Sequence, residues 1–187
     1  NELSETIIHL DISNNYLENS LNLGNPENLN IGYNNISELK DLSSNIKTLN
    51  CEHNKITEVG SNIPINVTDL DCNNNCIEII GKLPNSIETL IISYNCIKEL
   101  NNLPENLQEL ECNFNKIIKI NYIPTNTTFI DCSGNDLKEI IFNENIKYNL
   151  NKLDCSNNNI SKIENIPASL NYLDISSNSI NTIDSSF

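Results

Sequence analysis

Seven cysteines and two histidines are the side chains best suited to act as nucleophiles, bases or metal ligands. Zinc-type sites use Cys-x-x-Cys pairs or clustered histidines, and the sequence has neither. Its single Cys/His neighbourhood is Cys51-Glu52-His53. No motif places a nucleophile beside His9 or His53. We therefore expect no metal site, no cofactor and no catalytic residue, so the chain is predicted not to be an enzyme.

The spacing of the cysteines gives most of them a structural role. Five occupy a position that isoleucine fills in other copies of a repeated apolar pattern; these are Cys51, Cys72, Cys112, Cys132 and Cys155. We expect these five to be buried as small apolar side chains. Cys76 and Cys96 share another position, where neighbouring copies would bring their Cα atoms to about 5 Å, within disulfide range. Parallel side chains usually do not converge, so a disulfide is the less favoured alternative.

The charge balance excludes several classes of partner. The chain has a formal net charge of -14, and all 11 of its basic residues are lysines. Phosphate contacts need Lys and Arg, so we expect no nucleic-acid partner and no membrane partner. No apolar run approaches the ~20 residues of a membrane-spanning helix. The odd number of cysteines favours a reducing compartment, which predicts an intracellular protein, in a cytoplasm, a host cytoplasm or a virion, rather than a secreted one.

A repeat of about twenty residues runs through the chain and must position these side chains. One asparagine per copy marks its phase: Asn15, Asn34, Asn54, Asn75, Asn95, Asn115, Asn135, Asn158 and Asn178. Around each lies the same apolar frame, as in Leu107-x-x-Leu110-x-Cys112-x-x-Asn115-x-Ile117-x-x-Ile120. An amide side chain can both donate and accept hydrogen bonds. We therefore expect these asparagines to form a ladder that satisfies the backbone where each turn bends inward.

This frame resembles the leucine-rich-repeat family, and the resemblance covers nearly the whole chain. The short period and the Ile-Pro or Leu-Pro steps, as at Ile63-Pro64 and Leu103-Pro104, are similar to the short repeats of bacterial effectors. Similar Asn-rich repeats occur in amoebae and in giant viruses that infect them. The resemblance implies an α/β fold by convention: a solenoid of nine turns with a short parallel sheet on its concave face. We expect residues 1–187 to form a single leucine-rich-repeat domain of a longer chain.

The residue pattern predicts the same architecture independently. Leu110 and Cys112 alternate with Glu111, as in a short strand with one face inward, and one strand per turn gives a parallel sheet. The other side of each turn is too short for a regular helix, and its prolines hold the chain extended. We expect a convex face that is extended, polyproline-like or 3-10, with little or no α-helix. An insertion at residues 141–149 is either a bulge or a small apolar contact surface.

Outward strand positions form the concave surface, where two features are predicted to bind a partner. Carboxylates form an acidic stripe through the middle turns: Asp69, Asp71, Glu109, Glu111 and Asp131. An apolar and aromatic group lies close to it: Ile91, Tyr94, Phe114 and Phe129. Exposed aromatic side chains ringed by charge are typical of interfaces, and the stripe would attract a basic partner. The alternatives are a merely solvated face and a Ca²⁺ site, although no calcium-loop motif is present.

The sequence thus predicts a non-catalytic module that binds a protein partner, with a basic surface, through its concave face. One rival hypothesis is a structural element of a virion, filament or cell surface that self-associates end to end or through the insertion. Another is the substrate-recruiting arm of a larger enzyme such as a ubiquitin ligase, with catalysis outside these residues.

Overall fold

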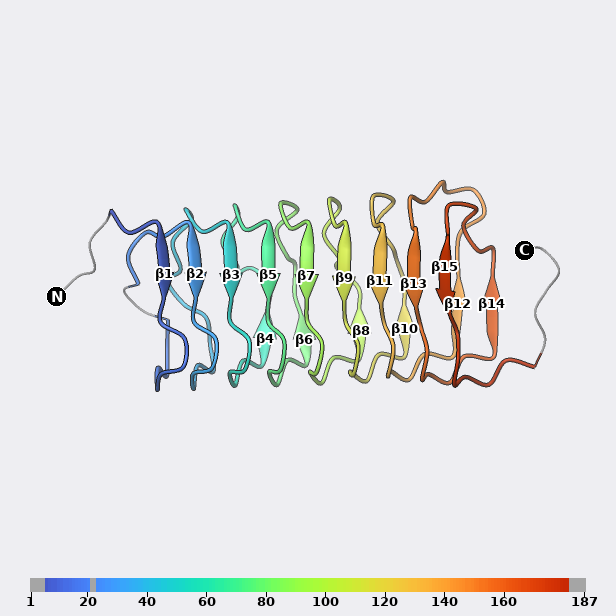
Figure 1. Ribbon diagram of the computed structural model, residues 1–187, viewed down its shortest axis with the longest axis horizontal. Helices are drawn as coiled ribbons and strands as arrows, with labels where there is room; N and C mark the ends of the chain where they lie inside the picture. The colour runs from blue at the N-terminus through green and yellow to red at the C-terminus, as the bar shows by residue number, and fades with distance from the viewer. Residues whose placement is uncertain (1–5, 21–22, 182–187) are drawn as a thin grey trace.

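The computed structural model describes residues 6–20 and 23–181, which wind into a solenoid of nine turns (Figure 1). Each turn contributes one three-residue strand to a continuous parallel sheet, here called the main sheet. Its strands follow the chain in order: β1 (His9–Asp11), β2 (Asn28–Asn30), β3 (Thr48–Asn50), β5 (Asp69–Asp71), β7 (Thr89–Ile91), β9 (Glu109–Glu111), β11 (Phe129–Asp131), β13 (Lys152–Asp154) and β15 (Tyr172–Asp174). The predicted nine-turn parallel solenoid is confirmed.

The register of the main sheet keeps the same repeat position side by side in successive turns. The middle residues of neighbouring strands pair with one another, as in Leu49, Leu70 and Leu90, and these leucines are buried. Successive side chains of a strand point to opposite faces, so the residues that flank the middle one point outward. Every outward position therefore forms a column of side chains along the sheet.

The convex side consists of shorter extended segments. Six strands lie there: β4 (Glu58–Val59), β6 (Ile79–Ile80), β8 (Glu99–Leu100), β10 (Lys119–Ile120), β12 (Glu139–Ile141) and β14 (Lys162–Glu164). They form three parallel pairs, β4–β6, β8–β10 and β12–β14, which the sequence pattern did not predict. Residues 6–20 and 23–181 contain neither α-helix nor 3-10 helix, so the predicted extended convex face is confirmed.

Prolines begin the tight turns that lead the chain back to the main sheet. The carbonyl of Pro64 accepts the N–H of Val67 at 3.1 Å, and the carbonyl of Pro84 accepts that of Ile87 at 3.3 Å. Proline lacks an N–H and has a fixed φ, so it can start such a turn without losing a hydrogen bond. The copy with the insertion at 141–149 lacks this proline and uses a different turn, in which Ile146 donates to the Asn143 carbonyl at 3.0 Å.

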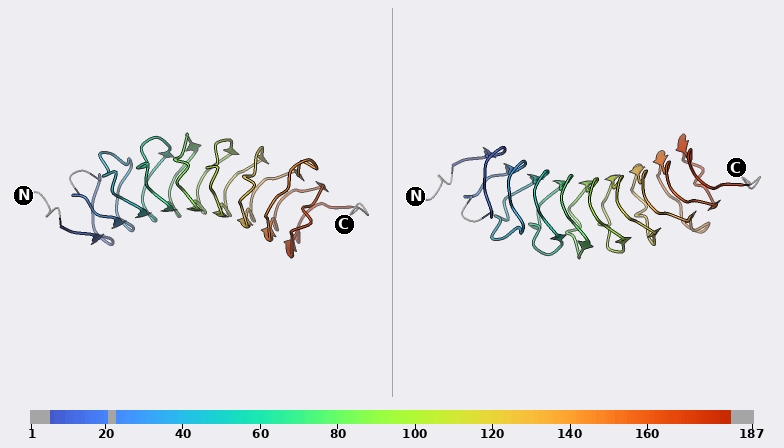
Figure 2. Two further views of the ribbon diagram at one scale, coloured as in Figure 1. Left: turned by 90° about the horizontal axis from the view of Figure 1, so that it is seen from above. Right: turned by 90° about the horizontal axis from the view of Figure 1, so that it is seen from below.

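The solenoid is curved, and the main sheet lies on the inner side of the arc (Figure 2). The core fills the space between the main sheet and the convex strands. The five cysteines expected to be buried have 0% exposure: Cys51, Cys72, Cys112, Cys132 and Cys155. All seven cysteines are free, so Cys76 and Cys96 form no disulfide.

From the second repeat onward, the asparagine of each repeat bonds its turn to the preceding one. The Asn95 amide donates to the carbonyl of Cys72 at 3.0 Å and to that of Ile92 at 3.1 Å, and its oxygen accepts the N–H of Ile77 at 2.8 Å. Equivalent bonds to the preceding turn are made by Asn34, Asn54, Asn75, Asn95, Asn115, Asn135, Asn158 and Asn178. Asn15, in the first turn, donates to the carbonyls of Ile12 and Ser13. The ladder thereby satisfies backbone groups that the bend would leave unpaired.

Candidate functional site

Three columns of side chains line the concave face. The first column and the central column come from the first and third residues of each strand, and the third comes from the residue three positions after the strand ends. The turns that contain β5, β7, β9 and β11 are turns 4, 5, 6 and 7. All nine predicted site residues lie on them: Asp69, Asp71, Ile91, Tyr94, Glu109, Glu111, Phe114, Phe129 and Asp131.

The third column has left-handed backbone, and we call it the left-handed column. Its members have φ values from 49° to 63°: Asn14, Tyr33, His53, Asn74, Tyr94, Phe114, Gly134, Asn157 and Ser177. Gly and Asn tolerate this region, whereas aromatic residues there are strained by roughly 1 kcal/mol or more each. Such strain persists only where the surrounding structure enforces it, and it is concentrated at functional sites.

Aromatic members of the left-handed column form two stacked pairs. The ring centroids of Tyr94 and Phe114 lie 4.6 Å apart with an interplanar angle of 18°. Those of Tyr33 and His53 lie 4.2 Å apart, also at 18°. Tyr33, Tyr94 and Phe114 remain 45–49% exposed. Tyr33 and His53 were not among the predicted site residues, although their common repeat position is the signal that would have found the pair.

Gly134 makes room for one face of the Tyr94–Phe114 pair. A Cβ atom at this glycine would lie 2.9 Å from Cδ1 of Phe114, which is closer than van der Waals contact. Gly134 also has a φ of 63°, a conformation that glycine adopts without strain. The Phe114 ring is therefore fixed between Tyr94 on one side and the Gly134 backbone on the other.

Phe129 lies apart from the Tyr94–Phe114 pair. It is in the first column, at the opposite end of the strands from the left-handed column. Lys152 Nζ lies 4.9 Å from the Phe129 ring centroid and 5.1 Å from that of Tyr172. The apolar group that the sequence suggested is therefore divided between the two ends of the strands of the main sheet.

The carboxylates of turns 4, 6 and 7 have no cationic partner within ion-pair distance in the described part of the chain. The ion pairs there join Lys40 to Glu38, Lys47 to Glu27 and Lys162 to Glu164. Burial raises the pKa of Asp71, and the charge of Glu52 adds to this effect. Burial also raises the pKa of Glu111, with further contributions from the charges of Asp131 and Asp71. The middle of the concave face thus carries uncompensated, partly desolvated negative charge.

Most of the central column has a role in the backbone. A side-chain oxygen of Asp or Asn accepts the N–H of the residue two positions later, which closes an Asx turn at the end of the strand. Seven turns have this contact, made by Asp11, Asn30, Asn50, Asp71, Asp131, Asp154 and Asp174. Turns 5 and 6 have Ile91 and Glu111 there instead. Asx turns therefore account for the Asp and Asn residues at seven of the nine positions of the central column. The two exceptions lie in turns 5 and 6, which also contain Tyr94 and Phe114.

The buried cysteines are poor nucleophiles. Burial raises the pKa of Cys155 to about 12 and also raises that of Cys112, so both thiols stay protonated near neutral pH. Within residues 6–20 and 23–181, no three His, Cys, Asp or Glu side chains are close enough together to hold a metal ion. The same residues include no helix with the length and apolar character needed to cross a membrane.

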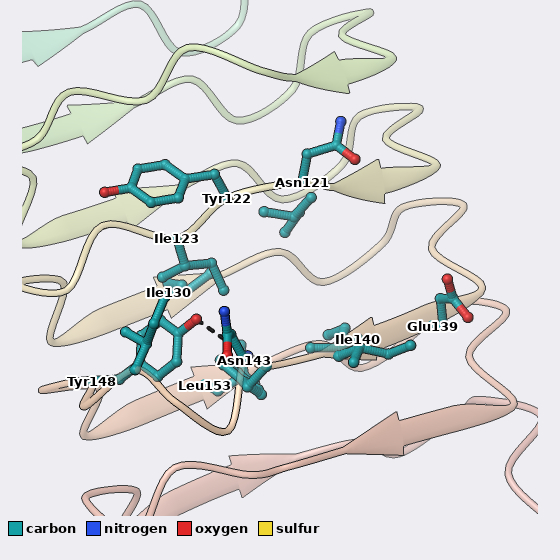
Figure 3. Close-up of a pocket in the computed structure, with 13 residues that line it drawn as sticks. Asn121, Tyr122, Ile123, Ile130, Glu139, Ile140, Asn143, Tyr148 and Leu153 are labelled. Carbon is teal, nitrogen blue, oxygen red and sulfur yellow. Dashed lines mark hydrogen bonds between the residues drawn. The ribbon is translucent and has the colours of Figure 1, made fainter.

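A second candidate site is a cavity of about 180 Å³ beside the insertion on the convex side (Figure 3). It lies where strand pairing is interrupted between β10 and β12. Most of its lining residues are aliphatic or aromatic and come from the insertion, the convex strands and the core: Ile120, Tyr122, Ile123, Ile130, Ile140, Ile141, Phe142, Ile146, Tyr148 and Leu153, together with Asn121, Glu139 and Asn143. The Asn143 N–H donates to the Tyr148 hydroxyl at 3.3 Å. Phe142 packs edge-on against Tyr148, at 5.4 Å between centroids.

Comparisons with known proteins agree with this architecture. Residues 149–170 match the family model described as Leucine Rich Repeat. YopM from Yersinia enterocolitica superimposes with a TM-score of 0.90 and 29% identity, over 98% of this chain and 40% of YopM. The functional domain of InlJ from Listeria monocytogenes, described as including a cysteine ladder, has a TM-score of 0.68 and 31% identity, over 85% of this chain and 36% of InlJ. A Shigella effector leucine-rich-repeat domain has a TM-score of 0.64 and 22% identity, over 89% of this chain and 71% of that domain.

The repeat, the solenoid and these similarities define a class. The chain has the leucine-rich-repeat solenoid fold, which it shares with YopM and with the Shigella effector domain. It spans less than half the length of YopM and of InlJ. A search of curated protein sequences gave no match. The leucine-rich-repeat fold is in general an interaction scaffold without catalytic activity of its own.

Proposed function

We propose that the chain is a non-catalytic module that binds a protein partner with a basic surface through the concave face of turns 4 to 7. The observation that carries the proposal is the exposed Tyr94–Phe114 pair, held in strained backbone. Asp71, Glu111 and Asp131, in the central column of turns 4, 6 and 7, have no ion pair among the described residues. Interfaces combine a few aromatic anchors with complementary charge, and they place both on a rigid support.

The solenoid supplies that rigid support. Each turn is hydrogen-bonded to its neighbours through the main sheet and the asparagine ladder, so the partner-facing side chains are already ordered before binding. Preorganisation reduces the entropy that binding would otherwise lose. We place the module inside a cell, where its seven free thiols would stay reduced. The same binding role would suit the substrate-recruiting arm of a larger enzyme such as a ubiquitin ligase.

A self-associating structural role is the second candidate function. It is favoured by exposed apolar side chains in or beside the convex strands, among them Ile79 (60% exposed), Ile118 (51%) and Ile141 (49%). This role predicts that the mass measured by analytical ultracentrifugation rises with concentration, and that Ile79→Asn with Ile141→Asn abolishes the rise. Binding through the concave face predicts a constant mass for the isolated chain.

Affinity capture from cell lysate tests the proposed function. The bait proteins are the native chain and the double variant Tyr94→Asn, Phe114→Asn. Asparagine already occupies three positions of the left-handed column, so both substitutions suit the backbone. The matched control is Tyr16→Asn with Ile65→Asn, which removes two exposed apolar side chains outside the three columns.

We expect the native chain and the control to capture the same protein and the concave-face variant to lose it. A basic partner should also bind more weakly at higher salt, since exposed charges are screened. Capture of the same proteins by all three baits, or capture by none, would contradict binding through this face.

A further inference from the structure

Three buried polar atoms on successive turns have no hydrogen-bond partner. They are Asn73 Oδ1 in turn 4, Ser93 Oγ in turn 5 and Asn113 Oδ1 in turn 6. Ser93 is only 2% exposed. All three residues occupy the same repeat position, directly before the left-handed column and two residues after the central column. Buried polar atoms are nearly always hydrogen-bonded, so three unpaired atoms on neighbouring turns are candidates for binding a polar group of a ligand.

The neighbouring turns explain why Ser93 lacks a partner. In turn 7 the equivalent Ser133 donates its hydroxyl to Asp131 at 2.7 Å, and in turn 8 Ser156 donates to Asp154 at 2.8 Å. In turn 5 the corresponding acidic position is Ile91, which has no oxygen to accept the bond. The serine is retained without the carboxylate that binds it elsewhere, so its hydroxyl lacks the partner that Ser133 and Ser156 have.

The groups around Ser93 are almost all acceptors. Asn73 and Asn113 present amide oxygens, and Asp71 and Glu111 present carboxylates in the central column on either side of Ile91. Asn113 uses its Nδ2 atom to donate to Asp131 at 2.9 Å, so its free atom is an oxygen. A ligand that satisfies this set must be rich in donors and positively charged.

We propose that the concave face of turns 4 to 6 binds the guanidinium group of an arginine side chain of the partner, between Asp71 and Glu111 and over Ile91. This inference rests on the proposed function and names the partner group that it would recognise. A guanidinium has five N–H donors in a rigid plane, whereas a lysine ammonium has three. The site offers three unpaired polar atoms and two carboxylates, and these five groups match the five N–H donors of a guanidinium.

The spacing of the strands agrees with a planar group. Parallel strands lie about 4.8 Å apart, so β5 and β9, which carry Asp71 and Glu111, lie about 10 Å apart. A guanidinium bonded along both edges spans most of this distance at ordinary N–H···O lengths. Ile91, between the two carboxylates, offers an apolar surface to the aliphatic stem of the arginine.

The partner group cannot come from a second copy of these residues. All 11 basic residues of the chain are lysines, so the 187 residues contain no arginine to insert into the site. The inference therefore separates binding of a different protein from the self-associating role.

NMR titration of the isotope-labelled chain tests the site. The probe is a capped peptide with one arginine between glycines, and the comparison peptides carry citrulline or lysine instead. Citrulline keeps the shape of arginine but is uncharged. We expect saturable shifts of backbone signals in turns 4 to 6 and a dissociation constant roughly tenfold lower for the arginine peptide than for either comparison.

Three variants show which groups carry the binding. Glu111→Gln and Ser93→Ala should each raise the dissociation constant of the arginine peptide several-fold. Glu58→Gln makes the same change in net charge on the convex strand β4 and should leave binding unchanged. Ser93→Ala should also raise the melting temperature, because it removes a buried hydroxyl without a partner; its loss of binding is then not a loss of fold.

The remaining outcomes contradict either the guanidinium site or the proposed function, and the two cases can be distinguished. Equal affinity for arginine and citrulline peptides, equal affinity for the lysine peptide, or equal loss in Glu58→Gln would overturn the guanidinium site. If the peptides fail while the Tyr94/Phe114 variant still loses its captured protein, the inference is wrong and the proposed function stands. If the arginine peptide binds but that variant captures the same proteins as the native chain, the proposed function is wrong.

Discussion

At the scale of single residues, the hydrogen bonds of the buried polar groups distinguish residues that maintain the fold from residues that are candidates for binding. The ladder asparagines use both ends of their amides, and most central-column Asp and Asn side chains close Asx turns. Ser93 differs from the equivalent serines because its turn has Ile91 in place of the aspartate that accepts the hydroxyl proton elsewhere. Residues with complete hydrogen bonding therefore maintain the fold, and residues without it are the ones to examine for binding.

Replacing a ladder asparagine should destabilise the chain in proportion to the bonds lost. Asn95→Ala leaves the Ile77 N–H without its acceptor inside the core. It also removes one of the two donors to the Cys72 carbonyl and one of the two to the Ile92 carbonyl, which keep Asn75 and Asn115 respectively. We expect a loss of about 2–4 kcal/mol in the free energy of unfolding, measured by urea denaturation. Asn15→Ala is the matched control: its bonds stay within the exposed first turn, and it should cost less than about 1 kcal/mol. Equal effects at the two positions would show that bonding between turns is unimportant.

At the scale of elements, the left-handed column and the insertion are the two features that a regular repeat would not have. The column holds aromatic rings in backbone that suits Asn or Gly. The insertion replaces a proline turn with a segment that packs Phe142 into the core and leaves Ile141 exposed. Each is a local departure whose energetic effect can be measured by itself.

Gly134→Ala should be destabilising because of Phe114. The added Cβ would lie 2.9 Å from the ring and would also occupy left-handed backbone. We expect a loss of about 1–3 kcal/mol. In a Phe114→Ala background the clash disappears, and only the smaller backbone cost of about 1 kcal/mol should remain. A double-mutant cycle by urea denaturation measures this coupling; strict additivity would mean that the ring moves away freely.

The insertion should contribute to stability through one side chain. Phe142 is 2% exposed and packs against Tyr148, so Phe142→Ala should cost about 3–5 kcal/mol. The adjacent Ile141 is 49% exposed, and Ile141→Ala should cost less than about 1 kcal/mol. Thermal denaturation of both variants distinguishes a packed insertion from a loose bulge, for which the two effects would be similar and small.

At the scale of the whole molecule, a net charge of -14 is spread over a long, thin solenoid, and part of it is concentrated on the inner face. The main sheet lies on the inner side of the curve, so its outward positions face the concave side (Figure 2). Charge of one sign on such a face increases the rate of encounter with a basic protein and destabilises the free chain.

Stability and binding should therefore respond to pH in opposite directions. Burial raises the pKa values of Asp71 and Glu111, so the folded chain holds these protons more tightly than the unfolded chain. Their destabilising contribution is complete above the folded pKa values and is relieved as pH falls through them. The gap in the free energy of unfolding between the native chain and Asp71→Asn with Glu111→Gln should narrow from pH 7 toward about pH 4. Affinity for a basic partner should fall over the same range, and a constant gap would contradict this account.

The sequence by itself determined the period, the phase and the face on which each residue lies. One Asn per repeat and alternation around residues such as Leu110 and Cys112 set which side chains point inward. The register follows because neighbouring copies share the same apolar positions. The extended convex side followed from the short return path and its prolines. These are local properties of one repeat, so they could be predicted by comparing the copies.

The tertiary structure decided how side chains in neighbouring turns meet. The stacking of Tyr94 on Phe114, the contact of Lys152 with Phe129 and the pairing of convex strands all depend on rotamers and packing between turns. The unpaired hydroxyl of Ser93 also depends on what its neighbours lack, because its counterparts in turns 7 and 8 find an acceptor. A repeat pattern fixes which residues are neighbours, but only close packing fixes which of their atoms bond.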